Sequence, residues 1–248
     1  MIDPIIANIG PFTIKWYGVI MAFGYLAGLF IATKLAKYRN LKKTDIQDFL
    51  IYLIPTAIIG ARIGHILSSL NYYLNNPLKM FAIWNGGLAF HGGFIAAIFM
   101  AIYFCKKRDI KFYNLADVFV VPLAFGLIFG RFGNLINQEL YGRITTLPWG
   151  ISITGVEGKR HPSQIYEAIK NLIIFITTYN LIKIKSLPRG FVFWTFTLMY
   201  SILRFIVEFY RDWPPAYFNL TWAQIVSIPL IIISTTMLTK LKDNKLKR

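Results

Sequence analysis

Long apolar stretches recur along the chain and are separated by short polar segments. A bilayer core of about 30 Å is crossed by about 20 helical residues. Backbone groups that lie in lipid must pair within a helix or a closed barrel, and stretches of this length without strict alternation favour helices. We therefore predict seven membrane-spanning helices, over Trp16–Thr33, Phe49–Leu70, Leu88–Phe104, Leu115–Asn134, Ser163–Ile182, Phe191–Phe209 and Thr221–Leu238.

The composition agrees with a chain embedded in lipid. Of the 248 residues, 56% are hydrophobic, and the mean hydropathy is +0.51, far from the balance of a soluble domain. We predict an all-α polytopic membrane protein whose residues 1–248 form a single integral membrane domain. Its longest loop, residues 138–162, contains several glycines and a β-branched stretch at Ile151–Val156. This pattern predicts a small extracytoplasmic hairpin or cap, inserted between the fourth and fifth helices.

Positive charge alternates from one predicted loop to the next. The formal net charge is +16, and 17 of the 27 Lys and Arg residues fall on one side of a seven-helix arrangement. Because cytoplasmic loops are enriched in Lys and Arg, this places the N-terminus outside and the C-terminus in the cytoplasm. A nucleic-acid-binding face would gather its charge on one folded surface, so we expect no nucleic-acid partner. The 17 residues are Lys34, Lys37, Arg39, Lys42, Lys43, Lys106, Lys107, Arg108, Lys111, Lys183, Lys185, Arg189, Lys240, Lys242, Lys245, Lys247 and Arg248.

Ionisable residues inside the sixth apolar stretch need an explanation. A charge at the bilayer centre costs about 2.5–3.5 kcal/mol on insertion scales, so it requires a partner. Four polar residues at intervals of four, four and three share one helix face, which allows Arg204 to pair with Glu208. The alternative is an ion pair that only fixes helix packing, followed by an arginine that reaches the interface. The four residues are Tyr200, Arg204, Glu208 and Arg211.

A second polar group lies at the end of the fourth stretch. Arg131 is followed by Asn134 on the same predicted helix face and by Glu139 close behind, and Arg62 adds a guanidinium in the second stretch. With the glutamates of the fifth and sixth stretches, these residues predict a polar pocket of net positive potential near the outer leaflet. The planar guanidinium suits phosphate oxygens. We therefore expect an anionic lipid headgroup as the ligand.

His91 stands before a pair of glycines near the outer end of the third stretch. Histidine titrates near neutrality, which makes His91 a candidate general base, and a packing role is the alternative. Tyr17, beside Trp16, fits the aromatic belt at a membrane surface. The three histidines are not at paired helical spacing, so we expect no metal site.

At these residues the sequence resembles the prolipoprotein diacylglyceryl transferases of bacteria. The resemblance covers nearly the whole chain, with seven helices in the same orientation and five motifs in the family's order. One departure is the loop from Arg143 to Lys159, which is shorter than in some members. The motifs are Trp16-Tyr17-Gly18, Gly86-Gly87-x-x-x-His91-Gly92-Gly93, Gly130-Arg131-x-Gly133-Asn134-x-x-x-x-Glu139-x-x-Gly142, Arg160-His161-Pro162-Ser163-Gln164-x-Tyr166-Glu167 and Tyr200-x-x-x-Arg204-x-x-x-Glu208-x-x-Arg211.

The resemblance implies transfer of the sn-1,2-diacylglyceryl group from phosphatidylglycerol to the lipobox cysteine of a preprolipoprotein signal peptide. The products are a thioether and glycerol 1-phosphate, and no cofactor is required. It also implies a multi-pass protein of the bacterial cytoplasmic (inner) membrane with its active site toward the outer leaflet. Catalytic roles are implied for His91, Arg131, Arg204 and Tyr17. Binding of phosphatidylglycerol is implied for Arg131, Asn134, Glu139, Gly142, Tyr200, Arg204 and Glu208.

The chemistry gives these roles a reason. Arg131 and Arg204 would stabilise the charge that develops on phosphate when the carbon–oxygen bond breaks, and Glu208 would hold Arg204. The thiol attacks as a thiolate, with His91 as the base or, alternatively, a phosphate oxygen or a tyrosine. A transporter for an anionic solute is the rival from another class. The chain shows no repeated halves and gathers its polar residues at one leaflet, which disfavours a transporter. A lipid-binding scaffold does not explain the element around His91.

Overall fold

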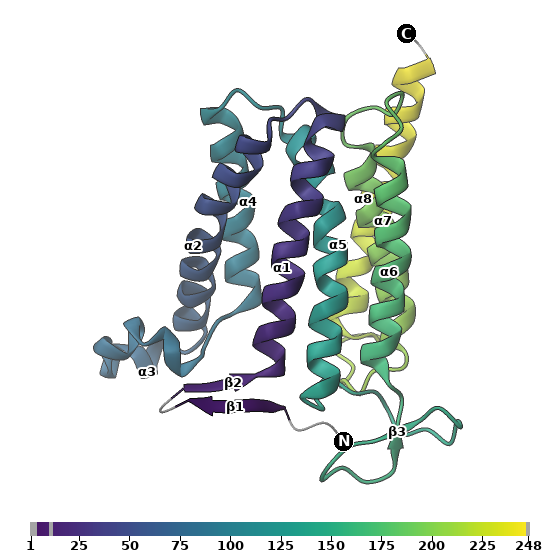
Figure 1. The fold of residues 1–248 in the computed structure, drawn as a ribbon. Helices are drawn as coiled ribbons and strands as arrows, with labels where there is room; N and C mark the ends of the chain where they lie inside the picture. The colour runs from purple at the N-terminus through teal and green to yellow at the C-terminus, as the bar shows by residue number, and fades with distance from the viewer. Residues whose placement is uncertain (1–3, 10–11, 247–248) are drawn as a thin grey trace.

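The computed structural model describes residues 4–9 and 12–246 and consists mainly of long helices that run side by side (Figure 1). A helix of at least 18 residues lies at each of the seven predicted positions. These are α1 (Trp16–Leu35), α2 (Lys43–Ser68), α4 (Phe90–Lys107), α5 (Phe112–Ile136), α6 (Ser163–Leu181), α7 (Phe191–Glu208) and α8 (Trp222–Leu246). Five of them, α1, α2, α5, α7 and α8, are long and apolar enough to cross a membrane. The prediction of an all-α membrane protein is confirmed at this level.

Two helices extend well beyond the predicted stretches. α2 begins at Lys43, ahead of the predicted Phe49, because its first turn is polar and is capped by Asp45, which accepts the Lys42 backbone N–H at 2.8 Å. α8 continues to Leu246 through a basic segment. Hydropathy marks the part of a helix that suits lipid, whereas the helix itself ends where its backbone caps are. Lys247 and Arg248 of the basic tail lie outside the described residues.

Several short elements lie at one end of the bundle (Figure 1). The loop of residues 138–162 contains a short antiparallel pair, in which Ile151 faces Arg160, and the prediction that this loop forms an extracytoplasmic cap stays a prediction. An N-terminal hairpin and a short helix that lies across the bundle axis were not predicted. The elements at this end are β1 (Ile5–Ile9), β2 (Phe12–Lys15), α3 (Leu70–Asn75), β3 (Ile151–Ser152) and β4 (Lys159–Arg160), with 3-10 turns at Pro77–Phe81 and Ile83–Asn85. A further 3-10 turn, Ala36–Arg39, follows α1 at the opposite end.

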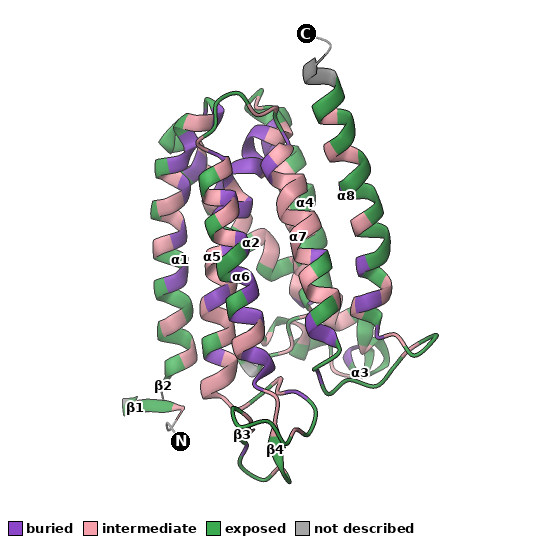
Figure 2. Cartoon of the chain, turned by 90° about the vertical axis from the view of Figure 1, so that its right-hand side faces the viewer, coloured by how far each residue is buried: buried purple, intermediate pink, exposed green. Residues whose placement is uncertain are grey.

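Buried residues concentrate at both ends of the bundle, as Figure 2 shows. Where α1 ends and α5 begins, the buried group is apolar and includes Leu35, Phe49, Phe104 and Val118. At the end that carries the short elements, the buried side chains of α6 and α7 are mostly polar. The apolar group therefore closes one end of the bundle, and the functional residues predicted from the sequence lie toward the other.

A buried ion pair ties three elements together at the apolar end. Asp117 of α5 is fully buried and accepts the Arg39 Nε–H at 2.8 Å. Its two oxygens also accept the backbone N–H groups of Gly190 at 3.0 Å and Phe193 at 2.9 Å. Gly190 is the N-cap of α7 and Phe193 lies in its first turn, so their N–H groups would otherwise lack partners within the helix. Asp117 thus neutralises a buried guanidinium and caps a helix of a distant part of the chain.

The helices α2 and α4 meet through their backbones. A Cβ atom on Gly60 would lie 2.3 Å from Ala96 Cβ and 2.7 Å from the carbonyl oxygen of Gly92. One on Gly92 would lie 2.3 Å from the carbonyl oxygen of Gly60. Only glycine permits this approach, which is a common way for helices to pack in lipid. The Ala89 N–H extends the contact by donating to Ala61 O at 2.9 Å.

Candidate active site

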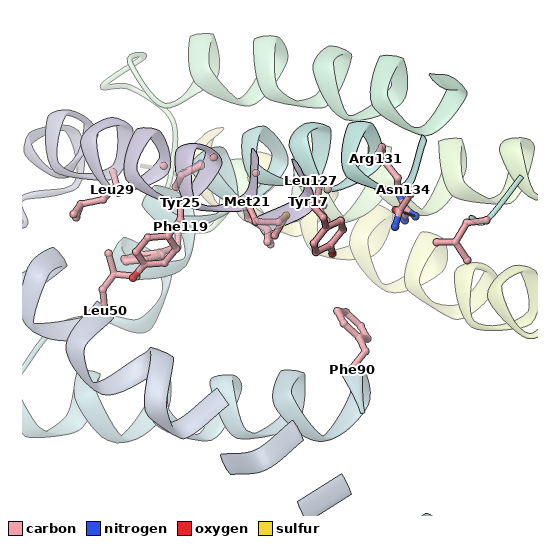
Figure 3. A pocket seen from close by; sticks show the side chains of 18 residues that line it. Tyr17, Met21, Tyr25, Leu29, Leu50, Phe90, Phe119, Leu127, Arg131 and Asn134 are labelled. Carbon is pink, nitrogen blue, oxygen red and sulfur yellow. Dashed lines mark hydrogen bonds between the residues drawn. The ribbon is translucent and has the colours of Figure 1, made fainter. Parts of the chain in front are cut away.

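A cavity of about 600 Å³ lies between α1 and α5 on one side and Leu50 of α2 and Phe90 of α4 on the other (Figure 3). Its wall is largely apolar, and Arg131 and Asn134 lie together at one end of it. Gly126 lines the cavity, and a Cβ atom added there would meet nothing within 4 Å. The site is therefore an apolar space with a cationic and hydrogen-bonding end.

Next to Arg131, one carboxylate gathers three cations. Glu167 of α6 is fully buried, and its Oε2 lies 2.6 Å from Lys170 Nζ and 3.7 Å from Arg131 Nε. Its Oε1 accepts a hydrogen bond from Arg204 Nη1 of α7. Three helices, α5, α6 and α7, therefore meet at this carboxylate. The side chains of Arg131 and Arg204 remain 18% and 16% exposed, so neither arginine is fully enclosed by the cluster.

The same network continues to Glu208. Arg204 Nη2 lies 2.8 Å from Glu208 Oε2, which confirms the pairing predicted from the four-residue spacing. Glu208 also accepts the Thr221 Oγ1–H at 2.8 Å. We call the connected set the charge cluster; its members are Arg131, Glu167, Lys170, Arg204, Glu208 and Arg211.

Arg211 completes the charge cluster just beyond the end of α7. Its Nε lies 3.8 Å from Glu208 Oε2, and its side chain is only 3% exposed. Within the part of the chain that the structure describes, its Nε and Nη1 have no hydrogen-bond partner. Burial lowers the pKa of this guanidinium to about 10, and the positive charge of Arg204 acts in the same direction. Arg211 is nevertheless protonated at neutral pH and adds positive potential to the site.

Asn134 links Arg131 to the segment that follows α5. Its Oδ1 accepts a hydrogen bond from Arg131 Nη1 at 3.3 Å, and its Nδ2 donates to Glu139 Oε1 at 2.7 Å. Gln164 Nε2 donates to the backbone oxygen of Glu139 at 2.7 Å. These contacts bring together three residues that the sequence predicted as neighbours. Glu139 itself is exposed, so its carboxylate lies at the rim of the cluster.

The position of Gly142 requires a glycine for a structural reason that is independent of any ligand. Its N–H donates to His161 O at 2.9 Å, and a Cβ atom would lie 2.2 Å from Tyr210 O. Three backbone segments meet at this position, and no side chain fits between them. The substrate-binding role implied for Gly142 stays a prediction.

Of the remaining predicted residues, Tyr17 lies in the cavity wall, Tyr200 contacts the charge cluster, and His91 has no described contact with it. Tyr17 lines the cavity and packs against Gly133 of α5, and the ring centroid of Tyr200 lies 4.0 Å from Lys170 Nζ. His91 follows Phe90 in the first turn of α4 and is exposed. Its described side-chain contact is with the ring of Phe90, and no described hydrogen bond or ion pair joins it to the arginines. The structure therefore does not place His91 in the charge cluster.

Two buried cations, Arg62 and Lys170, make contacts that the sequence analysis did not predict. Arg62 does not join the cluster in the described contacts but donates to the carbonyl oxygens of residues 79, 80, 86 and 87. It thereby fixes the segment that leads to His91. Lys170 was not anticipated, although its position three residues after Glu167 in an apolar stretch allowed this pairing to be found.

Comparison with known proteins identifies the family. A profile of the prolipoprotein diacylglyceryl transferases matches residues 4–240. A phosphatidylglycerol–prolipoprotein diacylglyceryl transferase of Geobacter sulfurreducens is 40% identical over 245 residues, which cover 95% of this chain and 94% of that relative. Proteins of the same name from Nitratidesulfovibrio vulgaris and Finegoldia magna are 39% and 36% identical over 96% and 99% of this chain, and over 94% and 98% of their own length. The chain belongs to the prolipoprotein diacylglyceryl transferase family of membrane enzymes.

Proposed function

We propose that this protein transfers the sn-1,2-diacylglyceryl group of phosphatidylglycerol to the cysteine thiol of a preprolipoprotein lipobox. The observation that carries the proposal is the apolar cavity that ends at Arg131 and Asn134. Its wall suits acyl chains, and a guanidinium suits the phosphate of a headgroup. The names of the relatives state phosphatidylglycerol and prolipoprotein as what those proteins act on.

The reaction breaks one bond and forms another. The thiolate sulfur attacks the glyceryl carbon that carries the phosphate, a carbon–sulfur bond forms, and the carbon–oxygen bond breaks. The electron pair of that bond goes to the phosphate, which leaves as glycerol 1-phosphate. The phosphate thus changes from a diester with one negative charge to a monoester that carries about two at neutral pH, since the second pKa of such a group is about 6.

The charge cluster supports a role in stabilising this growing charge. Arg204 is held between two carboxylates, and Arg131 is held by Glu167 and Asn134. Donors that are fixed before the reaction lose little energy to reorganisation when charge develops near them. Arg131 and Arg204 therefore act as electrostatic stabilisers of the leaving phosphate, and Asn134, Glu139 and Tyr200 position the headgroup.

His91 is the base that we propose for the thiol proton. It stands next to Phe90, which lines the cavity, and its exposed ring is accessible to a peptide. His91→Gln should slow transfer while lipid binding stays unchanged. A pH–rate profile of His91→Gln that matches that of the parent protein would assign the proton to a phosphate oxygen or a tyrosine instead.

The membrane arrangement is part of the proposal. Seven spans, with the N-terminus outside and the C-terminus in the cytoplasm, agree with the distribution of Lys and Arg. In that orientation the charge cluster faces the outer leaflet of a bacterial cytoplasmic membrane, where a secreted substrate would arrive. This orientation is tested with two single-cysteine variants, Ser152→Cys and Lys185→Cys, each in a Cys105→Ala background. A membrane-impermeant maleimide added outside the cell should label the cysteine at position 152 and not the one at position 185.

A reconstituted assay tests the activity itself. The purified protein is combined with labelled phosphatidylglycerol and a lipobox peptide that carries either cysteine or serine. Label should appear on the cysteine peptide alone and disappear in Arg131→Ala, whereas Arg108→Ala, at an exposed arginine at the other end of the bundle, should keep it. Full activity in Arg131→Ala would contradict the phosphate role. Lipid binding without transfer to either peptide would favour a transporter or a scaffold.

A further inference from the structure

Lys170 is a buried cation that the reaction as described does not use. Its side chain is 2% exposed, its Nζ lies 2.6 Å from Glu167 Oε2, and it stands over the ring of Tyr200. A buried ammonium group costs several kcal/mol unless it is well paired. Glu167 already has Arg131 and Arg204 as partners, so neutralising this carboxylate does not require a lysine.

The charge cluster therefore holds an excess of positive charge. Each of its four cations pairs with a carboxylate, but the cluster has only two carboxylates to share among them, so its net charge is +2. Phosphatidylglycerol brings one negative charge, whereas the phosphate monoester that leaves brings two. Without Lys170 the excess would fall to one, which matches the substrate rather than the product.

We propose that Lys170 is a positioning residue that acts through Glu167 and sets the charge of the phosphate site to match the leaving monoester. By pairing with Glu167 Oε2 at 2.6 Å, against 3.7 Å for Arg131 Nε, it takes over part of the neutralisation of Glu167 and leaves Arg131 and Arg204 more donor capacity for the phosphate. Its charge favours the transition state over the bound lipid, because the negative charge on phosphate grows as the carbon–oxygen bond breaks. This inference rests on the proposed function.

Lys170→Met tests the idea, since methionine keeps the length of the side chain and removes its charge. The electrostatic part of the binding free energy is proportional to the charge of the ligand. The logarithm of the loss of affinity should therefore be twice as large for a dianion as for a monoanion. We expect binding of glycerol 1-phosphate at pH 7, measured by calorimetry without peptide, to weaken about tenfold and the KM for phosphatidylglycerol to rise about threefold. The kcat/KM should fall about tenfold, because the transition state resembles the product in charge, and kcat should therefore fall about threefold.

Lys183→Met is the matched control. Lys183 follows the other end of α6 and also stands over a tyrosine, with its Nζ 3.7 Å from the ring centroid of Tyr179. It should leave kcat, KM and product binding within about twofold of the parent values. Lys170→Arg keeps the charge and should keep the ratio of product to substrate affinity within about 1.5-fold of the parent value, against an about threefold fall in Lys170→Met, and it tests the inference even if Lys170→Met fails to fold.

The outcomes separate two kinds of failure. Equal losses of affinity for glycerol 1-phosphate and phosphatidylglycerol in Lys170→Met, or loss of the ratio in Lys170→Arg, would show a merely structural role and overturn the inference. Unchanged product binding in Lys170→Met would also overturn it. A parent protein that transfers no label to the cysteine peptide would instead reject the proposed function.

Discussion

Asp117→Asn is the sharpest test of how the bundle is held together, because the substitution keeps the shape of the side chain. Asp117 accepts three N–H groups with two oxygens, two on Oδ2 and one on Oδ1. An asparagine has a single acceptor oxygen, so its NH₂ group must face at least one of these donors. The substitution also removes the negative charge beside Arg39, which is 5% exposed.

The expected loss follows from these contacts. Removing one partner of a buried ion pair costs about 3–5 kcal/mol, because the other charge stays buried. Each backbone N–H that loses its acceptor adds about 1–3 kcal/mol. Arg39 keeps hydrogen bonds to Tyr38 O at 3.1 Å and Ile182 O at 3.3 Å, which moderates the first cost. We therefore expect Asp117→Asn to lower the free energy of unfolding by about 4 kcal/mol.

Reversible unfolding in mixed micelles, followed by circular dichroism, measures this loss. The matched control is Asp48→Asn, which removes the acidic partner of Arg108 in a pair whose side chains are 34% and 43% exposed. An exposed pair contributes about 0–1 kcal/mol. A double variant, Asp117→Asn with Arg39→Met, should regain the part that belongs to the stranded guanidinium. If Asp117→Asn were no more destabilising than Asp48→Asn, the assignment of Asp117 as a structural tie would be wrong.

Three glycine substitutions separate space for a ligand from space for packing. Gly126→Leu fills the cavity from a position where a Cβ atom meets nothing within 4 Å. The rate of transfer should fall about tenfold or more, while the free energy of unfolding stays within about 0.5 kcal/mol of the parent value. Unchanged kinetics would contradict acyl-chain binding there. Gly60→Ala places a Cβ 2.3 Å from Ala96 Cβ and should cost about 1–3 kcal/mol in the same unfolding titration. Gly142→Ala, with Tyr210 O at 2.2 Å, should open the loop that contains β3 and β4 to limited proteolysis, and equal resistance to the parent would argue against that packing.

The sequence predicted those features that depend on local spacing. Apolar length located each long helix, and the interval of four residues identified Arg204 with Glu208 as a pair, since both rules act within one helix. The pair of Arg39 with Asp117 could not be predicted in this way. Its members are 78 residues apart, and Arg39 belongs to a cluster of basic residues that the positive-inside rule explains by itself.

Long-range geometry also decided the roles of individual site residues. Arg62 has the same residue type and apolar surroundings as Arg131, yet it binds backbone carbonyls of the segment after α3. No spacing rule connects a helical arginine to the backbone of an irregular segment. Conversely, the three cations around Glu167 come from three different helices, so their convergence depends on how α5, α6 and α7 pack.

The backbone contact between α2 and α4 determines how the cavity can change its width. No layer of side chains separates the two helices at Gly60 and Gly92, so there is nothing between them that can repack. Phe49 of α2 and Phe104 of α4 are anchored in the apolar group at the closed end. A motion of α2 or α4 that widens the cavity is therefore a tilt of both helices together about that end, a single hinge coordinate. Exchange of lipid with the cavity would then depend on the stiffness of one hinge. A cross-link near Phe90, joining α4 to the opposite wall of the cavity, would stop this exchange without changing the charged residues.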